Sequence, residues 1–454
     1  MAGSVPDREP EPDVKFENVN NQILGTLFKP PLIFWAVVGL FFIGFLYGLI
    51  AWGYILATGM GSTGLRPPSV MWAIFLSNFI FFIGLAHSGT LISAILYLFR
   101  ARFRTSINRM AEAMTMICIA LAGTYPLIHL GRSWLILWIL PYPNQRQLWP
   151  DFISPLIFDV LAVSTYFTVS LIFFYTGLVP DLAVVRDRTK GFRRTIYGYF
   201  AIGWTGSAKQ WHHYGTSYLL LAGLATALVI SVHTVVSWDF ALPIQPGWHS
   251  TIFPPYFVAG AIHSGVAMVL TLLIPMRRLF RIENIVTTRT LELLAETTIL
   301  MAGILGYSYL TEHFMAWYSK NVFEEQIFKF RVLGYYGWIY WMVVFCAVIA
   351  PLSFFFRKVR TTPILLFIIS ITINIGMWWE RFVIVVQSLS QNYLPFQWGF
   401  YWPRWPELAW TLATFCFLFS VFMLFAKYLP SIPITEVKKD SGIPTEKGGL
   451  YREE

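Results

Sequence analysis

Long apolar runs alternate with short polar segments along nearly the whole chain. A helix needs about 20 apolar residues to cross a bilayer, and runs of that length recur ten times. We expect spanning helices at residues 31–59, 70–99, 110–140, 152–179, 214–238, 252–276, 290–318, 332–356, 363–390 and 406–429. Residues 195–213 fit a short amphipathic segment on the membrane surface. The pattern predicts an all-α integral membrane protein without a large extramembrane domain.

Composition agrees with this pattern. Of the 454 residues, 56% are hydrophobic and 13% charged, whereas about a quarter are charged in a soluble domain, so a soluble globular enzyme is excluded. Cys118, Cys346 and Cys416 lie in apolar runs without a CxxC pair, so we expect packing roles and no iron–sulfur or zinc site. Residues 1–30 lack the basic region of a signal peptide and are expected to be an uncleaved tail.

The net charge of +9 is unevenly distributed. Four alternate loops hold 16 Lys and Arg residues, and the intervening loops hold six. The positive-inside rule places the basic loops and both termini, including the tail at 430–454, in the cytoplasm. The opposite loops are rich in Trp and Pro, as expected for an aromatic belt at the outer surface. We therefore attribute the charge to membrane orientation and not to nucleic-acid binding.

An internal repeat is visible in the sequence. AHSG at 86–89 returns as IHSG at 262–265, and residues 111–129 align without gaps on residues 295–313. The second alignment keeps three polar residues in register: Glu112 with Glu296, Tyr125 with Tyr309 and His129 with His313. The repeat predicts two parallel four-helix bundles with one added helix at each end. Their expected limits are 70–240 and 252–391 for the bundles, and 31–59 and 405–429 for the added helices.

Ionisable groups within a bilayer are costly, so each is a functional candidate. His129 lies about 20 residues beyond the cytoplasmic start of its span, and Asp159 lies near the outer start of the next, so the two can be level. Pro126 and Pro155 precede them and are expected to bend both helices around a cavity. A quinol loses a proton from each hydroxyl, which suits a His acceptor oriented by a carboxylate. The alternative is that His129 and Asp159 only pair with each other.

Other intramembrane groups suggest a polar chain. Glu112 and His87 can form a ladder from the cytoplasmic side, although Glu112 can also snorkel toward Arg109. His233 is a further buried candidate, and in the second half His263, Glu296 and His313 repeat the ladder. Val343 stands where a second Asp159 would fall, so no second quinol site is expected. Glu380 and Arg381 fit either a structural ion pair or a proton role.

The histidines also raise the possibility of a di-haem cytochrome b. His87 and His129 differ in depth by about 10 Å at 1.5 Å per residue. One iron cannot be held by both, so we expect no haem.

The AHSG span, the AEAMT…TYPLIHLGR span, the SPLIFD span and the repeat resemble the NrfD/polysulfide reductase membrane-subunit family over residues 20–430. The ten-helix branch in bacterial alternative complex III is most similar. The resemblance implies a subunit of the bacterial inner membrane that oxidises menaquinol near the periplasmic side, without haem or iron–sulfur cluster of its own. It implies three partners: a periplasmic iron–sulfur, molybdopterin-like subunit, a multihaem cytochrome c and a second NrfD-like subunit.

The same resemblance implies roles for individual residues. The quinol contacts are Tyr125, His129, Arg132 and Asp159. A proton path is implied through His87, Glu112, His233, His263, Glu296, His313, Glu380 and Arg381.

Two other functions fit parts of the sequence. A parallel repeat with buried charges suits a secondary transporter, but matching pairs of Gly/Pro-broken helices are missing from the sequence. A quinone-reactive anchor of a molybdopterin reductase is the second alternative. Its shorter eight-helix relatives lack the two added helices.

Overall fold

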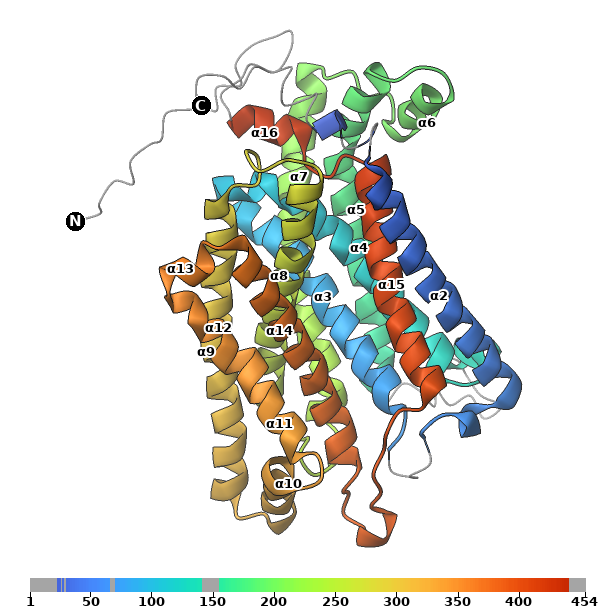
Figure 1. Ribbon diagram of the computed structural model, residues 1–454, viewed down its shortest axis with the longest axis vertical. Coiled ribbons are helices and arrows are strands. Elements are labelled where there is room, and N and C mark those ends of the chain that lie inside the picture. Colours follow the sequence, from blue (N-terminus) through green and yellow to red (C-terminus); the bar gives the residue numbers. More distant parts are fainter. Residues whose placement is uncertain (1–22, 26, 28–29, 66–69, 141–154, 441–454) are drawn as a thin grey trace, which may run out of the picture.

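The computed structural model describes residues 23–25, 27, 30–65, 70–140 and 155–440 (Figure 1). Within these residues it is all-helical, and ten helices are long and apolar enough to cross a membrane. They are α2 (Leu32–Thr58), α3 (Ala73–Leu98), α4 (Asn108–His129), α5 (Pro155–Asp187), α7 (Ala208–Ala241), α8 (Phe253–Leu279), α9 (Thr288–Ser319), the span Gly337–Phe355 that contains α11 (Gly337–Val344) and α12 (Ala350–Leu352), α14 (Pro363–Phe382, continuing to Gln387) and α15 (Trp405–Tyr428). The predicted fold class is confirmed.

Several predicted boundaries differ from the structure, and two of the differences have identifiable reasons. The third span ends at His129, not at 140, because Gly131 adopts a φ of 69° and a 3₁₀ segment, Ser133–Ile139, follows. The surface segment expected at 195–213 is the shorter helix α6 (Phe192–Phe200). Ser207 and Gln210 form a capping box that starts α7 at Ala208, so the following residues belong to the fifth span.

The helices pack around α3 and α8, which contact each other at the centre. α3, α4, α5 and α7 contact one another on one side, and α8, α9, α11 and α14 do so on the other. We call these groups the first and second bundles. α2 and α15 pair along their length, as Figure 1 shows at the right edge, and α15 packs against α4. The added helices thus form one unit, whereas the internal repeat stays a prediction.

The repeated tetrapeptides lie where the central helices cross. A Cβ on Gly265 of α8 would overlap the side chain of Ser88 on α3. A Cβ on Gly89 would overlap Thr115 and the Ala111 carbonyl on α4. The glycines therefore allow close helix contact, as small residues do in membrane helices.

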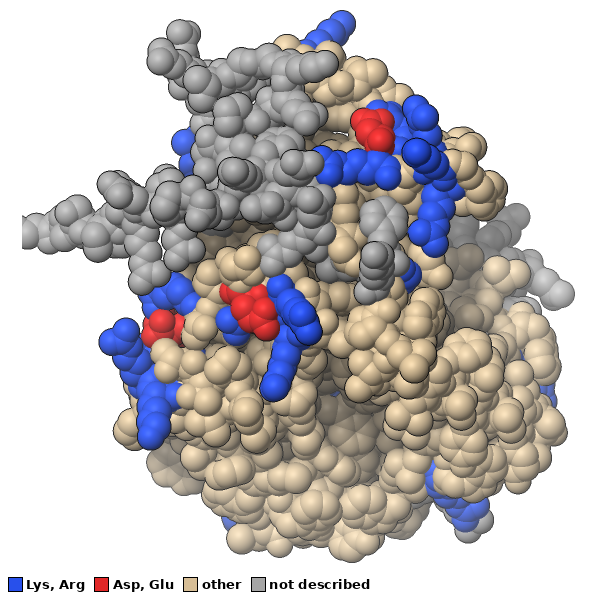
Figure 2. All heavy atoms as spheres, turned by 45° about the horizontal axis from the view of Figure 1, so that its top comes forward, with Lys and Arg blue, Asp and Glu red and all other residues tan. Residues whose placement is uncertain are grey.

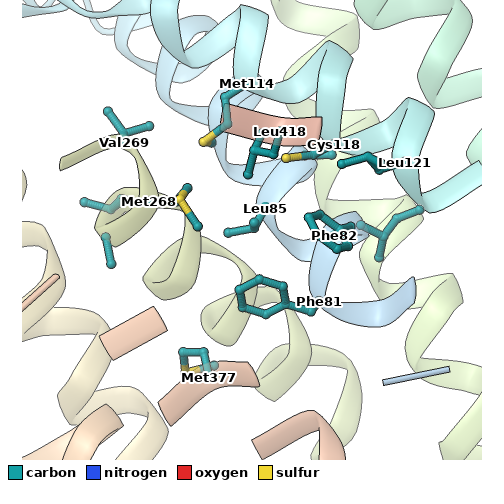
Figure 3. Close-up of a cluster of buried hydrophobic side chains, with 14 of the residues drawn as sticks. Phe81, Phe82, Leu85, Met114, Cys118, Leu121, Met268, Val269, Met377 and Leu418 are labelled. Atoms are coloured by element: carbon teal, nitrogen blue, oxygen red, sulfur yellow. The ribbon is translucent and has the colours of Figure 1, made fainter. Parts of the chain in front are cut away.

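Apolar side chains from five spans fill the centre. Phe81, Phe82 and Leu85 of α3 gather with Met268 of α8 and Leu418 of α15 (Figure 3). Cys118 lies in this cluster, and all three cysteines are buried and free, which agrees with packing roles.

The two ends of the molecule differ in charge. One end carries α6, α16 (Ile434–Asp440) and the Arg-rich connections after α3, α5, α8 and α12, and we call it the basic end. Figure 2 shows Lys and Arg side chains gathered there. The opposite end carries α10 (Val322–Leu333) and the segment 388–404.

The terminal segments pack more tightly than expected of free tails. Ile23, Leu24 and Leu27 are buried, and Lys427 donates a hydrogen bond to the Leu27 carbonyl. Residues 431–434 are also buried, and α16 follows them across the basic end. Most of 1–30, residues 441–454 and the aromatic loop at 141–150 lie outside the described residues.

Candidate functional site

Three polar residues lie at the end of the first bundle that is opposite the basic end. His129 is the last residue of α4, Asp159 lies in the second turn of α5, and Asp239 lies in the last turn of α7. α4 and α7 run toward this end and α5 starts from it, so all three share one level of the structure.

Asp159 and Asp239 face each other through their carboxyl groups, which interact directly. Asp159 is 7% exposed, and one oxygen of each carboxyl is buried without a hydrogen-bond partner. Two adjacent carboxyls with little access to water do not readily both ionise, which favours one shared proton between them. The pair has one more site for a proton and free acceptor atoms for a ligand hydroxyl.

His129 stacks on Trp72, with ring centroids 5.0 Å apart and an interplanar angle of 26°. Its Nδ1 atom is buried without a hydrogen-bond partner. Among the described residues no hydrogen bond or ion pair joins His129 to Asp159, so the pairing alternative is not observed. The imidazole is held in place while Nδ1 stays available.

The other two expected quinol contacts lie elsewhere. Tyr125 is fully buried, and its hydroxyl donates to Thr414 of α15 over 3.0 Å. Arg132 is exposed just beyond the end of α4. The Tyr125 ring stacks on Phe82. Tyr125 thus fixes α4 to α15.

Glu112 lies at the basic end of the first bundle. It is 2% exposed, pairs with Arg109 over 3.0 Å and accepts a hydrogen bond from Tyr218 over 3.1 Å. Arg109, expected in a loop, is itself buried in the first turn of α4 and also pairs with Asp181 over 3.3 Å. Glu112 therefore belongs to an enclosed ion cluster and does not snorkel to the surface.

A group of hydroxyls lies between Glu112 and the histidines. Thr115 is one turn beyond Glu112, and its Oγ1 lies 3.3 Å from that of Thr90. Thr90 in turn contacts Tyr166 at 3.1 Å and Ser170 at 3.4 Å. All four are nearly fully buried, so they continue the polar chain by one helical turn.

His87 and His233 form a pair in the middle of the first bundle. Their Nδ1 atoms are 3.0 Å apart, and the His87 ring stacks on Tyr166 at 4.5 Å. Nε2 of each ring is buried without a partner. The pair links α3 to α7 and follows the hydroxyl group in the chain.

The second bundle departs from the expected copy of this ladder. Glu296 is 38% exposed and pairs with Arg289 and Arg360 at the surface, next to the more buried Glu292. His263 is fully buried near the Ala347 backbone, where a π-helical turn spans Phe345–Ile349. The Glu296 carboxylate is therefore separate from the buried polar side chains.

The buried polar groups of the second bundle gather around Glu380. Its Oε1 accepts hydrogen bonds from Tyr256 and Tyr309, and its Oε2 lies 3.1 Å from Arg381. Arg381 also sits 4.8 Å from the centre of the Phe257 ring. His313 lies one turn from Tyr309 and hydrogen-bonds its carbonyl. This buried set has the features of a structural ion pair, although Nε2 of His313 is buried without a hydrogen-bond partner.

Among the described residues, the polar groups above form no metal site, and one cavity is lined by other residues. Within the described part of the chain, no group of three or more His, Cys, Asp or Glu side chains can hold a metal ion. A cavity of about 410 Å³ lies between α3, α8, α14 and α15. Its lining is mostly apolar, with Thr271, Asn374 and Thr411 as polar residues, so it suits a lipid chain better than a polar ligand.

The residues missed from the sequence lie one or two positions beyond predicted span limits. Asp239 follows the predicted end at 238, and Asp181 follows the predicted end at 179. A carboxylate directly after an apolar run was the available signal. Trp72 and the hydroxyl residues carry no charge, so the sequence contains no comparable signal for them.

Comparison with known proteins places the chain in a family. The profile of the family described as polysulphide reductase, NrfD, matches residues 64–392. A Halobacterium salinarum protein named as a membrane subunit of dimethyl sulfoxide reductase is 27% identical over 224 residues, 49% of this chain and 47% of that protein. The Nitratidesulfovibrio vulgaris menaquinone reductase integral membrane subunit is 28% identical over 142 residues, 29% of this chain and 34% of that protein. The chain thus spans about half and about a third of the lengths of these relatives. With the family profile covering most of its length, the protein belongs to the NrfD polysulphide reductase family.

Proposed function

We propose that the protein is the quinol-oxidising membrane subunit of a respiratory oxidoreductase of the alternative complex III type. The observation that carries the proposal is the buried Asp159–Asp239 carboxyl pair at the same end of the bundle as His129. The relative named as the integral membrane subunit of a menaquinone reductase supports the menaquinone–menaquinol couple as the substrate, and the relative named for dimethyl sulfoxide reductase supports a place in a redox complex.

The chemistry of the site suits hydroquinone oxidation. A hydroquinone releases two electrons and two protons, one proton from each hydroxyl. The carboxyl pair with one shared proton accepts one of them and becomes neutral, and neutral His129 accepts the other at Nδ1. Trp72 keeps the His129 ring in position. Tyr125 acts through packing, and Arg132 stays a candidate contact at the exposed end of α4.

The electrons leave through partner subunits. We assign the basic end to the cytoplasm of a bacterial inner membrane by the positive-inside rule. The quinol site then lies on the periplasmic side, where an iron–sulfur, molybdopterin-like subunit receives the electrons. A multihaem cytochrome c and a second NrfD-like subunit complete the assembly.

We also propose that the first bundle conducts protons. Glu112, the hydroxyl group around Thr90, and the His87–His233 pair form a nearly continuous polar chain. In the second bundle, His313, Glu380 and Arg381 form the set to which we assign a structural role, and His263 stays a candidate for the chain. Glu296 is left out because it lies at the surface.

One experiment separates this function from solute transport. The purified complex, in liposomes, is assayed for oxidation of a menaquinol analogue and for uptake of solutes. We expect quinol oxidation that depends on the co-purified redox subunits. Solute uptake by the chain alone, without quinol oxidation by the complex, would favour the transporter.

A further inference from the structure

Five charged side chains meet under the C-terminal segment at the basic end. Glu436 of α16 pairs with Arg104 over 2.8 Å, and Arg109 pairs with Glu112 and Asp181 over 3.0 and 3.3 Å. The backbone N–H and hydroxyl of Thr435 donate to Asp181 over 3.1 and 3.0 Å. The five residues come from four separate segments, and α16 joins the three ion pairs into one cluster.

The positive and negative groups of this cluster are unequal in number. Arg104 and Arg109 stay protonated, and the charge of Glu436 raises the pKa of Arg104 further although burial opposes this. Against these two cations stand three carboxyls, of Glu112, Asp181 and Glu436. Side-chain exposure is 0% for Asp181 and reaches only 13% for Glu436. A surplus negative charge is costly in such a site.

We propose that these five side chains form a proton-binding site that takes one proton from the cytoplasm. Both oxygens of Glu112 and of Asp181 accept hydrogen bonds. The bonds from Arg104 and Asn108 both fall on Oε2 of Glu436. One proton held among the three carboxyls makes the cluster neutral. The phenols of Tyr97, Tyr214 and Tyr218 face the cluster and are uncharged at neutral pH.

The C-terminal segment controls access to this site. Ser431, Ile432 and Ile434 are buried, so the segment covers the end of the first bundle, where Figure 1 shows α16 lying across the helix ends. Glu436 lies at the rim, where its partial exposure gives contact with water. Nη1 of Arg104 and Nε of Arg109 are buried donors without a protein partner, which points to bound water inside the cluster.

The second bundle offers a matched contrast. At its basic end Arg289 and Arg360 stand against Glu292 and Glu296. Two cations balance two carboxylates, and Arg289 is 58% exposed. This cluster has no surplus charge and no reason to bind a proton. The inference deepens the proposed proton chain, which starts at Glu112, but the charge count does not depend on quinol chemistry.

Infrared spectroscopy of the resting complex at neutral pH tests the charge count. We expect one protonated carboxyl fewer in Glu436→Gln and in Asp181→Asn than in the wild type, because either change balances the charges. Glu296→Gln, the matched control, is expected to equal the wild type. Arg104→Gln is expected to add one protonated carboxyl, a gain that misfolding does not mimic.

Wild-type spectra in Glu436→Gln, Asp181→Asn and Arg104→Gln alike would overturn the proposal. The measurement uses no quinol, so its result is separate from the fate of the proposed function. If the infrared differences are as expected but the wild-type complex does not oxidise menaquinol, only the quinol site is contradicted.

Discussion

Nδ1 of His87 lies 3.0 Å from Nδ1 of His233, a contact that joins α3 to α7 in the middle of the first bundle. A neutral imidazole has one N–H, so one ring donates and the other accepts. A proton passing this point requires both rings. The hydroxyl group lies on one side of the pair, and Asp239 follows His233 by six residues, about 9 Å along α7.

Replacing one ring is expected to interrupt proton movement. In His233→Leu we expect proton translocation by vesicles to fall at least tenfold while quinol oxidation persists, because the outer carboxyl pair is intact. His212→Leu, at an exposed histidine of the same helix, is the control. Both rates are measured on one preparation. Unchanged translocation, or an equal loss of both rates, would contradict a conducting pair.

The crossing of α3 and α8 depends on Gly265. In Gly265→Ala the added methyl group overlaps Ser88, and we expect a loss of about 1–3 kcal/mol in unfolding free energy, as for other overpacked sites. Adding Ser88→Gly removes the overlapping atoms and is expected to restore most of the loss. Thermal inactivation of the detergent-solubilised complex measures both variants. Failure of the second change to rescue the first would show that Gly265 has another role.

The Glu380–Arg381 pair is expected to be structural. Glu380→Ala leaves Arg381 buried without its partner, which costs about 3–5 kcal/mol in comparable sites. In the double variant with Arg381→Leu the unpaired charge is gone, so stability is expected to recover in part. Quinol oxidation per folded complex is the second readout. A stable Glu380→Ala protein that has lost proton translocation would instead support the conducting role.

Membrane sidedness can be tested with single cysteines. The native cysteines are buried, so they give little background with a membrane-impermeant maleimide. A cysteine replacing Arg188 at the basic end is expected to react only after cell lysis. One replacing Lys320 at the opposite end is expected to react in whole cells, once the outer membrane is permeabilised. The reverse labelling pattern would place the quinol site in the cytoplasm.

Hydrophobic patterning predicts the ten spans well because lipid imposes length and apolarity on each helix separately. It fails where a local feature ends a helix, as Gly131 does after α4. The repeat pairs Glu112 with Glu296, yet one is enclosed by Arg109 and Tyr218 and the other lies at the surface. Register alone contains no information on which neighbour covers a side chain. The Asp159–Asp239 contact likewise depends on the packing of α5 against α7.

Quinol oxidation by Asp159→Asn tests the central claim most directly. The amide cannot accept a proton, and removing one proton acceptor typically slows a reaction by about 10²–10⁴-fold. We therefore expect menaquinol oxidation by the assembled complex to fall at least about 100-fold, with Asp239→Asn showing a similar loss. Asp187→Asn, at an exposed position near the basic end of the same helix, is expected to keep wild-type turnover. Near wild-type oxidation by Asp159→Asn, with all subunits present in the membrane, would contradict the account.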